Sequence, residues 1–284
     1  LGCGHFCTSG LDCVDGILSD PFETPDGADH YYSEPLIRLP DDYICYRPPD
    51  YAAVVGSAPC LENGFVTFGC FNNLTKFNAE VVALWSKILG AAGDARLVLK
   101  CKQLGDNAMR QRVGDMFRTQ GIAAERLDLR GQSAHPDLLA QYNDIDIALD
   151  PLPFAGMTTT CEALWMGVPV ITLPGKAFAH RHAASHLHNA GLADWVADTP
   201  EKYLAIAAAQ RGEVSADVIS AHPLTEDQLS TLKAKLTARE GRTVKLTSSV
   251  DPDMLGGLIV TIGSRRIDGS IRTRLNALTQ AMKG

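Results

Sequence analysis

Apolar and polar positions along residues 66–210 follow two alternating patterns, which together predict strands that alternate with helices. Continuous apolar runs, typical of strands buried on both faces, precede segments in which apolar side chains recur every three or four residues. The apolar runs lie at 66–71, 96–101, 127–129, 145–149 and 169–173. The helical segments cover 107–120, 136–142, 179–189 and 201–210. Two further helical segments are defined at one end, one that begins at 78 and one that stops at 167. Such alternation is typical of a parallel sheet with helices on both faces, so the expected fold class is α/β.

Residues 1–50 lack this alternation and contain many turn signals, among them Asp20-Pro21 and Pro48-Pro49. We expect one strand and long connections there, because little in this stretch could close a core alone. The small and polar residues 51–64 indicate a linker. The first 50 residues are therefore interpreted as the tail of a domain whose main part lies outside this chain.

The last 74 residues form a third pattern, which indicates a small α+β domain. Thr225 and Gln228 are spaced as a capping box ahead of a helix that is expected to end at Gly241. Strands are expected at 244–250 and 258–262, with a tight turn at 256–257 between them and a final helix that includes 272–282. The predicted organisation is 1–50, 51–210 and 211–284.

Size and composition exclude several classes of protein. The chain has 284 residues, 45% of them apolar and 21% charged, as in a soluble globular protein with one large or two ordinary domains. No apolar stretch approaches the ~20 residues that span a bilayer, so we expect no transmembrane segment and a cytoplasmic location. No signal peptide is visible and Leu1 is not an initiator, so we expect a fragment that lacks its own beginning.

The formal charge changes along the chain. Residues 1–210 carry 15 Lys and Arg against 25 Asp and Glu, a balance of −10, whereas residues 211–284 carry 11 against 8, a balance of +3. The shift indicates two bodies of different origin or partner. Neither balance is basic enough to indicate binding to nucleic acid.

Cysteines and histidines were considered as metal ligands. The eight cysteines are scattered, and the one tight cluster, Cys3, His5 and Cys7, does not have zinc spacing, so most thiols are expected to be reduced and no metal site is predicted. A second cluster contains His180, His182, His186 and His188. It lacks a third ligand in register, so most of these histidines are interpreted as surface residues, with Arg181 the better partner for a phosphate.

The most informative stretch is the one that joins the apolar run 145–149 to the following helix. It contains Gly156 and three threonines, Thr158, Thr159 and Thr160. In a parallel sheet this handover lies at the carboxyl end of the strands, where free N–H groups and hydroxyls can seat a phosphate. The alternative is an ordinary N-cap, which threonine forms whether or not a ligand binds.

Three such strand ends are expected to meet at one rim of the sheet, at 72–76, 131–135 and 156–162. Lys76 supplies a cation, the threonines supply hydroxyls, and Glu162 is placed to accept from a ribose hydroxyl. Alternatively Lys76 is a solvated surface lysine and Glu162 an acid favoured by the helix dipole. Taken together, the three loops favour a site for a diphosphate that carries a sugar on each side.

Four motifs carry a family resemblance for residues 1–210. They are Thr8–Asp12 (TSGLD), Tyr32–Leu36 (YSEPL), Phe71–Lys76 (FNNLTK) and Thr158–Pro169 (TTTCEALWMGVP). In combination they resemble bacterial relatives of the O-linked N-acetylglucosamine transferases, the SPINDLY-like glycosyltransferases. The resemblance implies a GT-B enzyme with two Rossmann-like halves, of which the C-terminal, donor-binding half is present and the catalytic N-terminal half is mostly absent.

The same resemblance implies roles for individual residues. Lys76 would meet the diphosphate with help from Asn73, and the backbone near Gln132 and Ser133 would face the base. Thr158 and Thr159 would bind phosphate, and Glu162 would bind the ribose in place of an aspartate. Met157 and Leu138 replace histidines of the family. The implied reaction is inverting transfer from a UDP-GlcNAc-like donor to a protein acceptor, with no metal cofactor.

Residues 211–284 resemble a different family. The motifs are Ser220–Gln228, Val250–Val260 and Gly263–Leu275, and they are similar to the C-terminal domain of the ATP synthase delta subunit. The resemblance implies a stator component without chemistry of its own. Its partners would be the F1 head and the b subunit, which would place the chain at the inner membrane as a peripheral protein.

Three hypotheses remain open from the sequence. The chain is the donor-binding part of a glycosyltransferase fused to a stator-like module, or an ATP synthase component whose N-terminal domain is not catalytic. The third hypothesis is an artefactual chimera of two incomplete proteins, because the junction at Gln210-Arg211 has no Gly/Ser-rich spacer.

Overall fold

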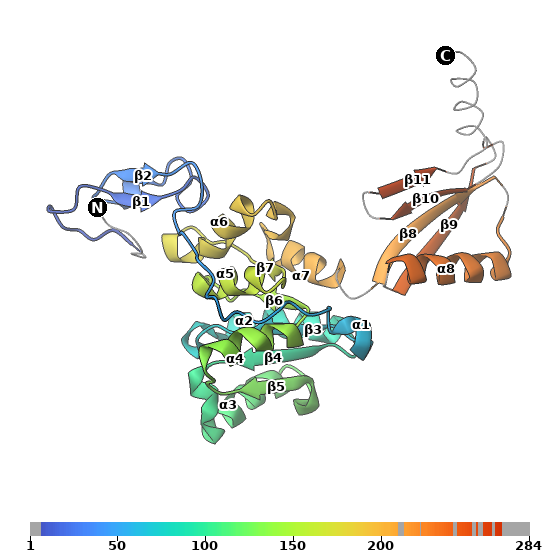
Figure 1. Cartoon of the computed structure of the whole chain (residues 1–284), viewed down its shortest axis with the longest axis horizontal. Helices are drawn as coiled ribbons and strands as arrows, with labels where there is room; N and C mark the ends of the chain where they lie inside the picture. The colour runs from blue at the N-terminus through green and yellow to red at the C-terminus, as the bar shows by residue number, and fades with distance from the viewer. Residues whose placement is uncertain are drawn as a thin grey trace, which may run out of the picture. The chain divides into compact units, whose positions relative to one another are not determined.

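The computed structural model of the chain describes residues 7–209, 213–221, 223–240, 243–251, 254, 258–262 and 265–268. The chain divides into two compact units, Leu1–Ala208 and Ala209–Gly284. Figure 1 shows the helices and strands of both units, and each unit is described by itself.

The first unit contains a five-stranded parallel sheet, as the alternating pattern predicts. Its strands are β3 (Thr67–Cys70), β4 (Arg96–Lys100), β5 (Leu127–Arg130), β6 (Ile147–Leu149) and β7 (Val170–Ile171). They lie in the order β5-β4-β3-β6-β7, and every pair is parallel. The strand order reverses between β3 and β6, so the chain leaves these two neighbours toward opposite faces of the sheet. This is the position at which open α/β sheets bind ligands.

Seven helices accompany this sheet in the described part of the unit. They are α1 (Cys60–Asn63), α2 (Ala79–Ala91), α3 (Asn107–Arg118), α4 (His135–Ala140), α5 (Thr158–Trp165), α6 (His182–Asn189) and α7 (Pro200–Ala209). The predicted start of α2 is confirmed, because the Asn78 side chain accepts a hydrogen bond of 2.8 Å from the Val81 N–H. The stretch 51–64, expected as a linker, contains α1 and is tied down at Cys60, whose N–H donates to Asp146 over 2.9 Å.

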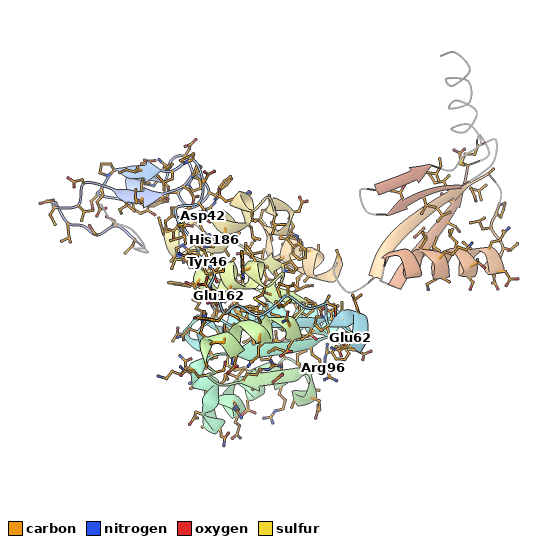
Figure 2. All side chains as sticks on the ribbon, viewed as in Figure 1. Asp42, Tyr46, Glu62, Arg96, Glu162 and His186 are labelled. Carbon is orange, nitrogen blue, oxygen red and sulfur yellow. The ribbon has the colours of Figure 1, made fainter. Side chains whose placement is uncertain are left out.

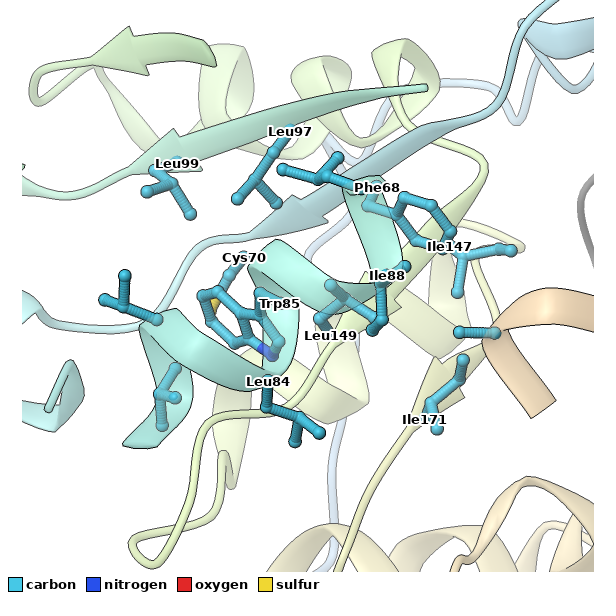
Figure 3. Close-up of a cluster of buried hydrophobic side chains, with 14 of the residues drawn as sticks. Phe68, Cys70, Leu84, Trp85, Ile88, Leu97, Leu99, Ile147, Leu149 and Ile171 are labelled. Carbon is cyan, nitrogen blue, oxygen red and sulfur yellow. The ribbon is translucent and has the colours of Figure 1, made fainter. Parts of the chain in front are cut away.

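Two apolar layers cover the two faces of the sheet. On one face Phe68 and Cys70 of β3 pack with Trp85 of α2, and all three are buried (Figure 3). On the other face Phe71 packs with Tyr142 and with residues of α5 and α6. Because successive side chains of a strand point to opposite faces, a short apolar run serves both layers.

Within the first unit, residues 7–50 pack on the rest of the unit through a small apolar cluster. Strands β1 (Ile17–Ser19) and β2 (Leu36–Arg38) form a parallel pair. Ile17 and Tyr43 are buried against Phe178, which precedes α6. One more strand is present than the single strand expected for this stretch.

The second unit is a four-stranded sheet with one described helix. Its elements are β8 (Glu213–Ser220), α8 (Glu226–Glu240), β9 (Thr243–Val250), β10 (Leu258–Ile262) and β11 (Arg265–Asp268). The predicted capping box is confirmed: Thr225 N–H donates to Gln228 Oε1 over 2.9 Å, and Gln228 N–H donates to Thr225 Oγ1 over 3.3 Å. Val218, Leu236 and Val260 form the core.

Two expectations for this unit are wrong. Strand β8 was not predicted, and β9 and β10 are not neighbours, because the sheet order is β11-β10-β8-β9. Strand β8 pairs parallel with β9, to which α8 connects it, and antiparallel with β10. It therefore lies between β9 and β10, so these two strands cannot form the expected hairpin. The expected turn at 256–257, the helix end at Gly241 and the final helix lie outside the described residues.

Candidate functional site

The loops that follow β3 and β6 meet at the point where the strand order reverses. The Lys76 ammonium donates to the Ala155 carbonyl over 2.7 Å and to the Asn72 side-chain oxygen over 2.9 Å. The Thr159 hydroxyl donates to the same Asn72 oxygen over 3.1 Å. A cation and the first turn of α5 are therefore held together by one amide side chain.

Asp150, the residue after β6, fixes the start of α5. Its carboxylate accepts a hydrogen bond of 2.6 Å from the Gly156 N–H and one of 2.7 Å from the Thr172 hydroxyl. Burial raises the pKa of Asp150 to about 6, although these hydrogen bonds and nearby Lys76 oppose the rise. A Cβ at position 156 would lie 2.6 Å from Thr159 Oγ1, so only glycine lets the loop close this tightly.

The three threonines form the first turn of α5. From the sequence we expected them in the loop that precedes this helix, and that expectation is wrong. Thr160 is buried and its hydroxyl donates to the Gly156 carbonyl over 3.1 Å. Thr158 is exposed and Thr159 half-buried. The N-cap residue of α5 is Met157 and no side chain caps the helix start, so none of the three threonines acts as an N-cap. Thr158 and Thr159 stand at the exposed end of the helix, where the helix dipole favours an anion.

Lys76 is not a solvated surface lysine. Its ammonium lies 4.5 Å from the centre of the Phe154 ring and is partly buried. Burial lowers the pKa of Lys76, and the buried Asp150 opposes this effect. A cation with little water around it interacts more strongly with an anion than an exposed one does.

The third loop reaches the same helix through a histidine that the sequence analysis did not single out. His135 Nε2 lies 2.9 Å from Glu162 Oε1, and its Nδ1 lies 2.9 Å from the Tyr51 hydroxyl. Glu162 is 6% exposed, so His135 holds the predicted ribose acid from the side of α4. The only sequence signal was the position of His135 in the predicted loop 131–135.

The other predicted contacts near this rim have mixed surroundings. The Asn73 side chain accepts from Gln103 Nε2 over 2.8 Å and from Thr75 N–H over 3.0 Å. Gln132 is exposed, whereas the Ser133 hydroxyl oxygen is shielded from solvent and has no hydrogen-bond partner within the described part of the chain. Nucleotide contacts at all three positions stay predictions.

Within the described structure, the Arg181 side chain donates its hydrogen bonds to backbone carbonyls and not to groups of the threonine helix start. Its Nε donates to the Phe22 carbonyl over 2.8 Å and its Nη1 to the Gly175 carbonyl over 3.0 Å. Burial lowers the pKa of Arg181, and Glu23 and Asp20 oppose this effect. The guanidinium thus ties the N-terminal segment to the sheet domain, and the phosphate role expected for Arg181 stays a prediction.

The interpretation of the histidine cluster as surface residues is wrong for His182 and His186, which are 0% and 4% exposed. Residues 20–43 cover both of them. The Tyr43 hydroxyl lies 2.9 Å from His182 Nδ1, and Asp42 lies 2.5 Å from His186 Nδ1. Cys3 and His5 lie outside the described residues, and within the described ones no three His, Cys, Asp or Glu side chains are placed to hold a metal ion.

Figure 2 places Asp42, His186, Tyr46 and Glu162 in one region, with Glu62 and Arg96 labelled near α1 and β4. The Tyr46 hydroxyl is shielded from solvent and has no hydrogen-bond partner among the described residues. Burial raises the pKa of Tyr46, and the charge of Glu162 adds to that rise. No motif or periodicity pointed to Tyr46 before its surroundings were seen.

A parallel α/β sheet with a cation and a helix start at its reversal point defines a Rossmann-like domain. The chain belongs to glycosyl transferase family 41, which it matches over residues 54–222. Residues 189–282 also match the ATP synthase delta (OSCP) subunit family. Both resemblances found in the sequence are therefore confirmed, and the two matches overlap at 189–222.

Individual relatives agree with this assignment. The chain is 40% identical over 205 residues to the probable UDP-N-acetylglucosamine–peptide N-acetylglucosaminyltransferase SPINDLY of Petunia hybrida, covering 72% of this chain and 22% of the relative. A lysine-to-methionine mutant of the Thermobaculum terrenum O-GlcNAc transferase superposes with a TM-score of 0.66 and 44% identity, over 72% of this chain and 38% of that one. The chain thus spans well under half the length of these transferases.

The C-terminal region has relatives of its own. The ATP synthase subunit delta of Erythrobacter litoralis is 74% identical over 87 residues, which cover 31% of this chain and 47% of that protein. None of the described helices combines the length and apolar character needed to cross a membrane.

Proposed function

We propose that residues 51–209 bind the diphosphate of a nucleotide sugar, as the donor-binding part of an inverting protein O-glycosyltransferase of the O-GlcNAc type. The observation that carries this proposal is the arrangement of Lys76, Asn72 and Thr159. It puts one partly buried cation beside the exposed start of α5, where a diphosphate would find an ammonium, hydroxyls and the positive end of a helix dipole.

The chemistry follows from this placement. In an inverting transfer the acceptor hydroxyl attacks the anomeric carbon and the nucleoside diphosphate leaves from the opposite face. Negative charge develops on the leaving phosphate, and donors fixed in advance lower the energy of that state. Lys76 and the N-terminus of α5 would supply this stabilisation, so no metal ion is required. The base that takes the acceptor proton would belong to the rest of the transferase.

Glu162 and the loop 131–135 would hold the nucleoside. The Glu162 carboxylate can accept hydrogen bonds from two ribose hydroxyls. For this, His135 must release Glu162 Oε1 or share that oxygen with a hydroxyl. The shielded Ser133 hydroxyl would bond to the base together with backbone near Gln132. The choice of a uracil-type base rests on the O-GlcNAc relatives, whose names specify UDP-N-acetylglucosamine.

For the second unit we propose a non-catalytic docking role. The support is the match of residues 189–282 to the ATP synthase delta (OSCP) subunit family, and the 74% identity of 87 residues of the chain to an ATP synthase delta subunit. Its partners would be the F1 head and the b subunit, which would hold the chain at the inner membrane as a peripheral protein. A pull-down of purified b subunit and F1 head by the full chain tests this role, and no retention of either one would contradict it.

Calorimetric titration of the full chain with UDP, GDP and their sugar conjugates tests the transferase proposal. We expect saturable binding of one nucleoside diphosphate, with the sugar conjugate competing for the same site. AMP serves as a control for unspecific nucleotide binding. Absence of heat and of competition with every diphosphate would overturn the proposal.

A further inference from the structure

Three side chains from separate segments form one hydrogen-bonded line that ends at the acid proposed to bind the ribose. Tyr51 lies between the N-terminal segment and α1, His135 is the first residue of α4, and Glu162 lies in α5. The Tyr51 hydroxyl lies 2.9 Å from His135 Nδ1, and His135 Nε2 lies 2.9 Å from Glu162 Oε1. The imidazole therefore connects the segment that precedes α1 to the nucleoside side of the site.

The chemistry of the three groups fixes the direction of both hydrogen bonds. A carboxylate only accepts, so His135 Nε2 carries a proton and donates to Glu162. In a neutral imidazole with that tautomer Nδ1 is an acceptor, and the Tyr51 hydroxyl donates to it. If the ring takes a second proton, Nδ1 donates and the Tyr51 oxygen accepts. The line therefore exists in either charge state of the ring, and a rotation of the imidazole breaks both bonds.

Ring packing and backbone contacts hold Tyr51 beside His135. The two rings meet edge to face, with their centroids 5.8 Å apart and an angle of 89° between the ring planes. Asn143 fixes the same segment a few residues further on, because its Nδ2 donates to the Val54 carbonyl over 3.0 Å and its Oδ1 accepts from the Gly56 N–H over 2.9 Å. Tyr51 thus belongs to a segment that is attached to the short 3-10 helix after α4.

The line determines which oxygen of Glu162 is open to a ligand. The Glu162 side chain is buried, and His135 occupies Oε1. Within the described residues the second oxygen, Oε2, has no hydrogen-bond partner. Oε2 is therefore the first acceptor for a ribose hydroxyl, and its direction depends on the imidazole that holds Oε1.

We propose that Tyr51 is a positioning residue for ribose recognition, which acts through His135 to hold the Glu162 carboxylate with Oε2 directed at a ribose hydroxyl. This inference rests on the proposed function, because the ligand is the same nucleotide. Tyr51 needs no contact of its own with that ligand. Since residues 51–56 join the N-terminal segment to the sheet, a shift of the N-terminal segment reaches the ribose acid through the same line.

Tyr51→Phe tests the proposal, because phenylalanine removes the hydroxyl and keeps the ring packing against His135. Calorimetry on the full chain compares UDP with its 2′,3′-dideoxy analogue. We expect the affinity for UDP to fall about threefold to tenfold, and the affinity for the analogue to change by less than about twofold, since the analogue has no ribose hydroxyl to bind. Equal losses for the two ligands, or no loss for either, would overturn the proposal.

Tyr31→Phe is the matched control. Tyr31 is 60% exposed against 55% for Tyr51, and its ring also lies beside a histidine, with its centroid 3.9 Å from that of His30. This variant should leave both affinities unchanged. In a chain that already carries Glu162→Gln, Tyr51→Phe should change UDP affinity by less than about twofold, because the acid on which it acts is gone. A full additional loss in that double variant would contradict the line.

Nitrogen-15 NMR of the histidine rings in the ligand-free full chain tests the line without a nucleotide, and His135→Gln identifies the His135 signals. At pH 8.5, where an imidazole is ordinarily neutral, we expect a protonated Nε2 and an unprotonated Nδ1. Tyr51→Phe should shift the Nδ1 signal and Tyr31→Phe should not. An unchanged Nδ1 signal in Tyr51→Phe would mean that no hydrogen bond joins the two side chains, and the proposal would fail.

The two possible failures are distinguishable. A wild-type chain that binds no nucleoside diphosphate overturns the proposed function, and this role of Tyr51 with it. A chain that binds UDP equally well with tyrosine and with phenylalanine at position 51 overturns the role of Tyr51 alone and leaves the proposed function standing.

Discussion

The Thr159 hydroxyl donates a hydrogen bond of 3.1 Å to the side-chain oxygen of Asn72, which joins the ends of two adjacent parallel strands. Asn72 follows β3, and Thr159 lies in the first turn of α5, the helix that follows β6. The strand order reverses between these two strands. Because Lys76 shares the same oxygen, the loop after β3 and the helix start after β6 are positioned as one unit.

Gly156→Ala should disrupt this seat. The new Cβ would lie 2.6 Å from Thr159 Oγ1 and 3.0 Å from Asp150 Oδ1, so the helix start or the carboxylate must move. We expect the unfolding free energy to fall by about 1–3 kcal/mol, as for other overpacked sites, with a matching loss of diphosphate affinity. Urea unfolding and UDP titration measure the two effects.

Gly114→Ala is the matched control. Gly114 lies in α3, and a Cβ there meets no atom within 4 Å. Alanine in an exposed helix position stabilises by up to about 1 kcal/mol relative to glycine. Equal losses of unfolding free energy in Gly156→Ala and Gly114→Ala would show that position 156 is no more closely packed than position 114.

Glu162→Gln should weaken nucleotide binding only when the ribose carries hydroxyls. The charged Glu162 carboxylate accepts stronger hydrogen bonds from hydroxyls than the neutral glutamine amide does. We therefore expect the affinity for UDP to fall about tenfold in the variant. The 2′,3′-dideoxy analogue should bind the wild type and the variant equally. A loss of the same size for both ligands would assign Glu162 to holding α5 through His135 and not to the ribose.

Glu23→Gln should stabilise the chain, and more so at higher pH. Burial, aided by Asp20, raises the pKa of Glu23 from 4.5 to about 9, although Glu23 Oε1 lies 2.9 Å from the equally buried His182 Nδ1. Because the folded state holds this proton more tightly than the unfolded state, stability declines as pH rises from 4.5 to about 9. We expect a gain on the order of 5 kcal/mol at pH 8 and below about 1 kcal/mol at pH 5.

Glu62→Gln is the control for this measurement, since Glu62 is exposed. Urea unfolding at pH 5, 6.5 and 8 gives the difference between each variant and the wild type. A pH-independent difference for Glu23→Gln would mean that Glu23 ionises normally in the folded chain.

The sheet of the first unit could be predicted because each buried strand carries its own apolar run and each helix its own period. The run 145–149 and the cap at Asn78 are local signals that survive without knowledge of the neighbours. Strand β8 gave no such signal, because Glu213–Ser220 mixes charged and polar residues with apolar ones and is placed by its pairing with β9 and β10. Its central position depends on contacts distant in sequence.

The site was predictable in its loops and less so in its partners. Parallel topology places strand ends at one edge, so Lys76 and the threonines were found from their positions after strands. Their hydrogen-bond partners were not, because Asn72 and Asp150 have no distinctive spacing. The burial of His182 and His186 arises from residues more than 130 positions earlier in the chain, which no periodicity in α6 can reveal.

The central claim is that Lys76 and the start of α5 hold a diphosphate, and the comparison of UDP with UMP affinity tests it most directly. Calorimetry on the wild type should show UDP binding about tenfold or more tighter than UMP, since the second phosphate meets the Lys76 ammonium. Lys76→Ala should remove this difference, while Lys102→Ala, at an exposed lysine of the next loop, should keep it. If Lys76→Ala retains the full preference for UDP, Lys76 does not hold the second phosphate and the proposed site is wrong.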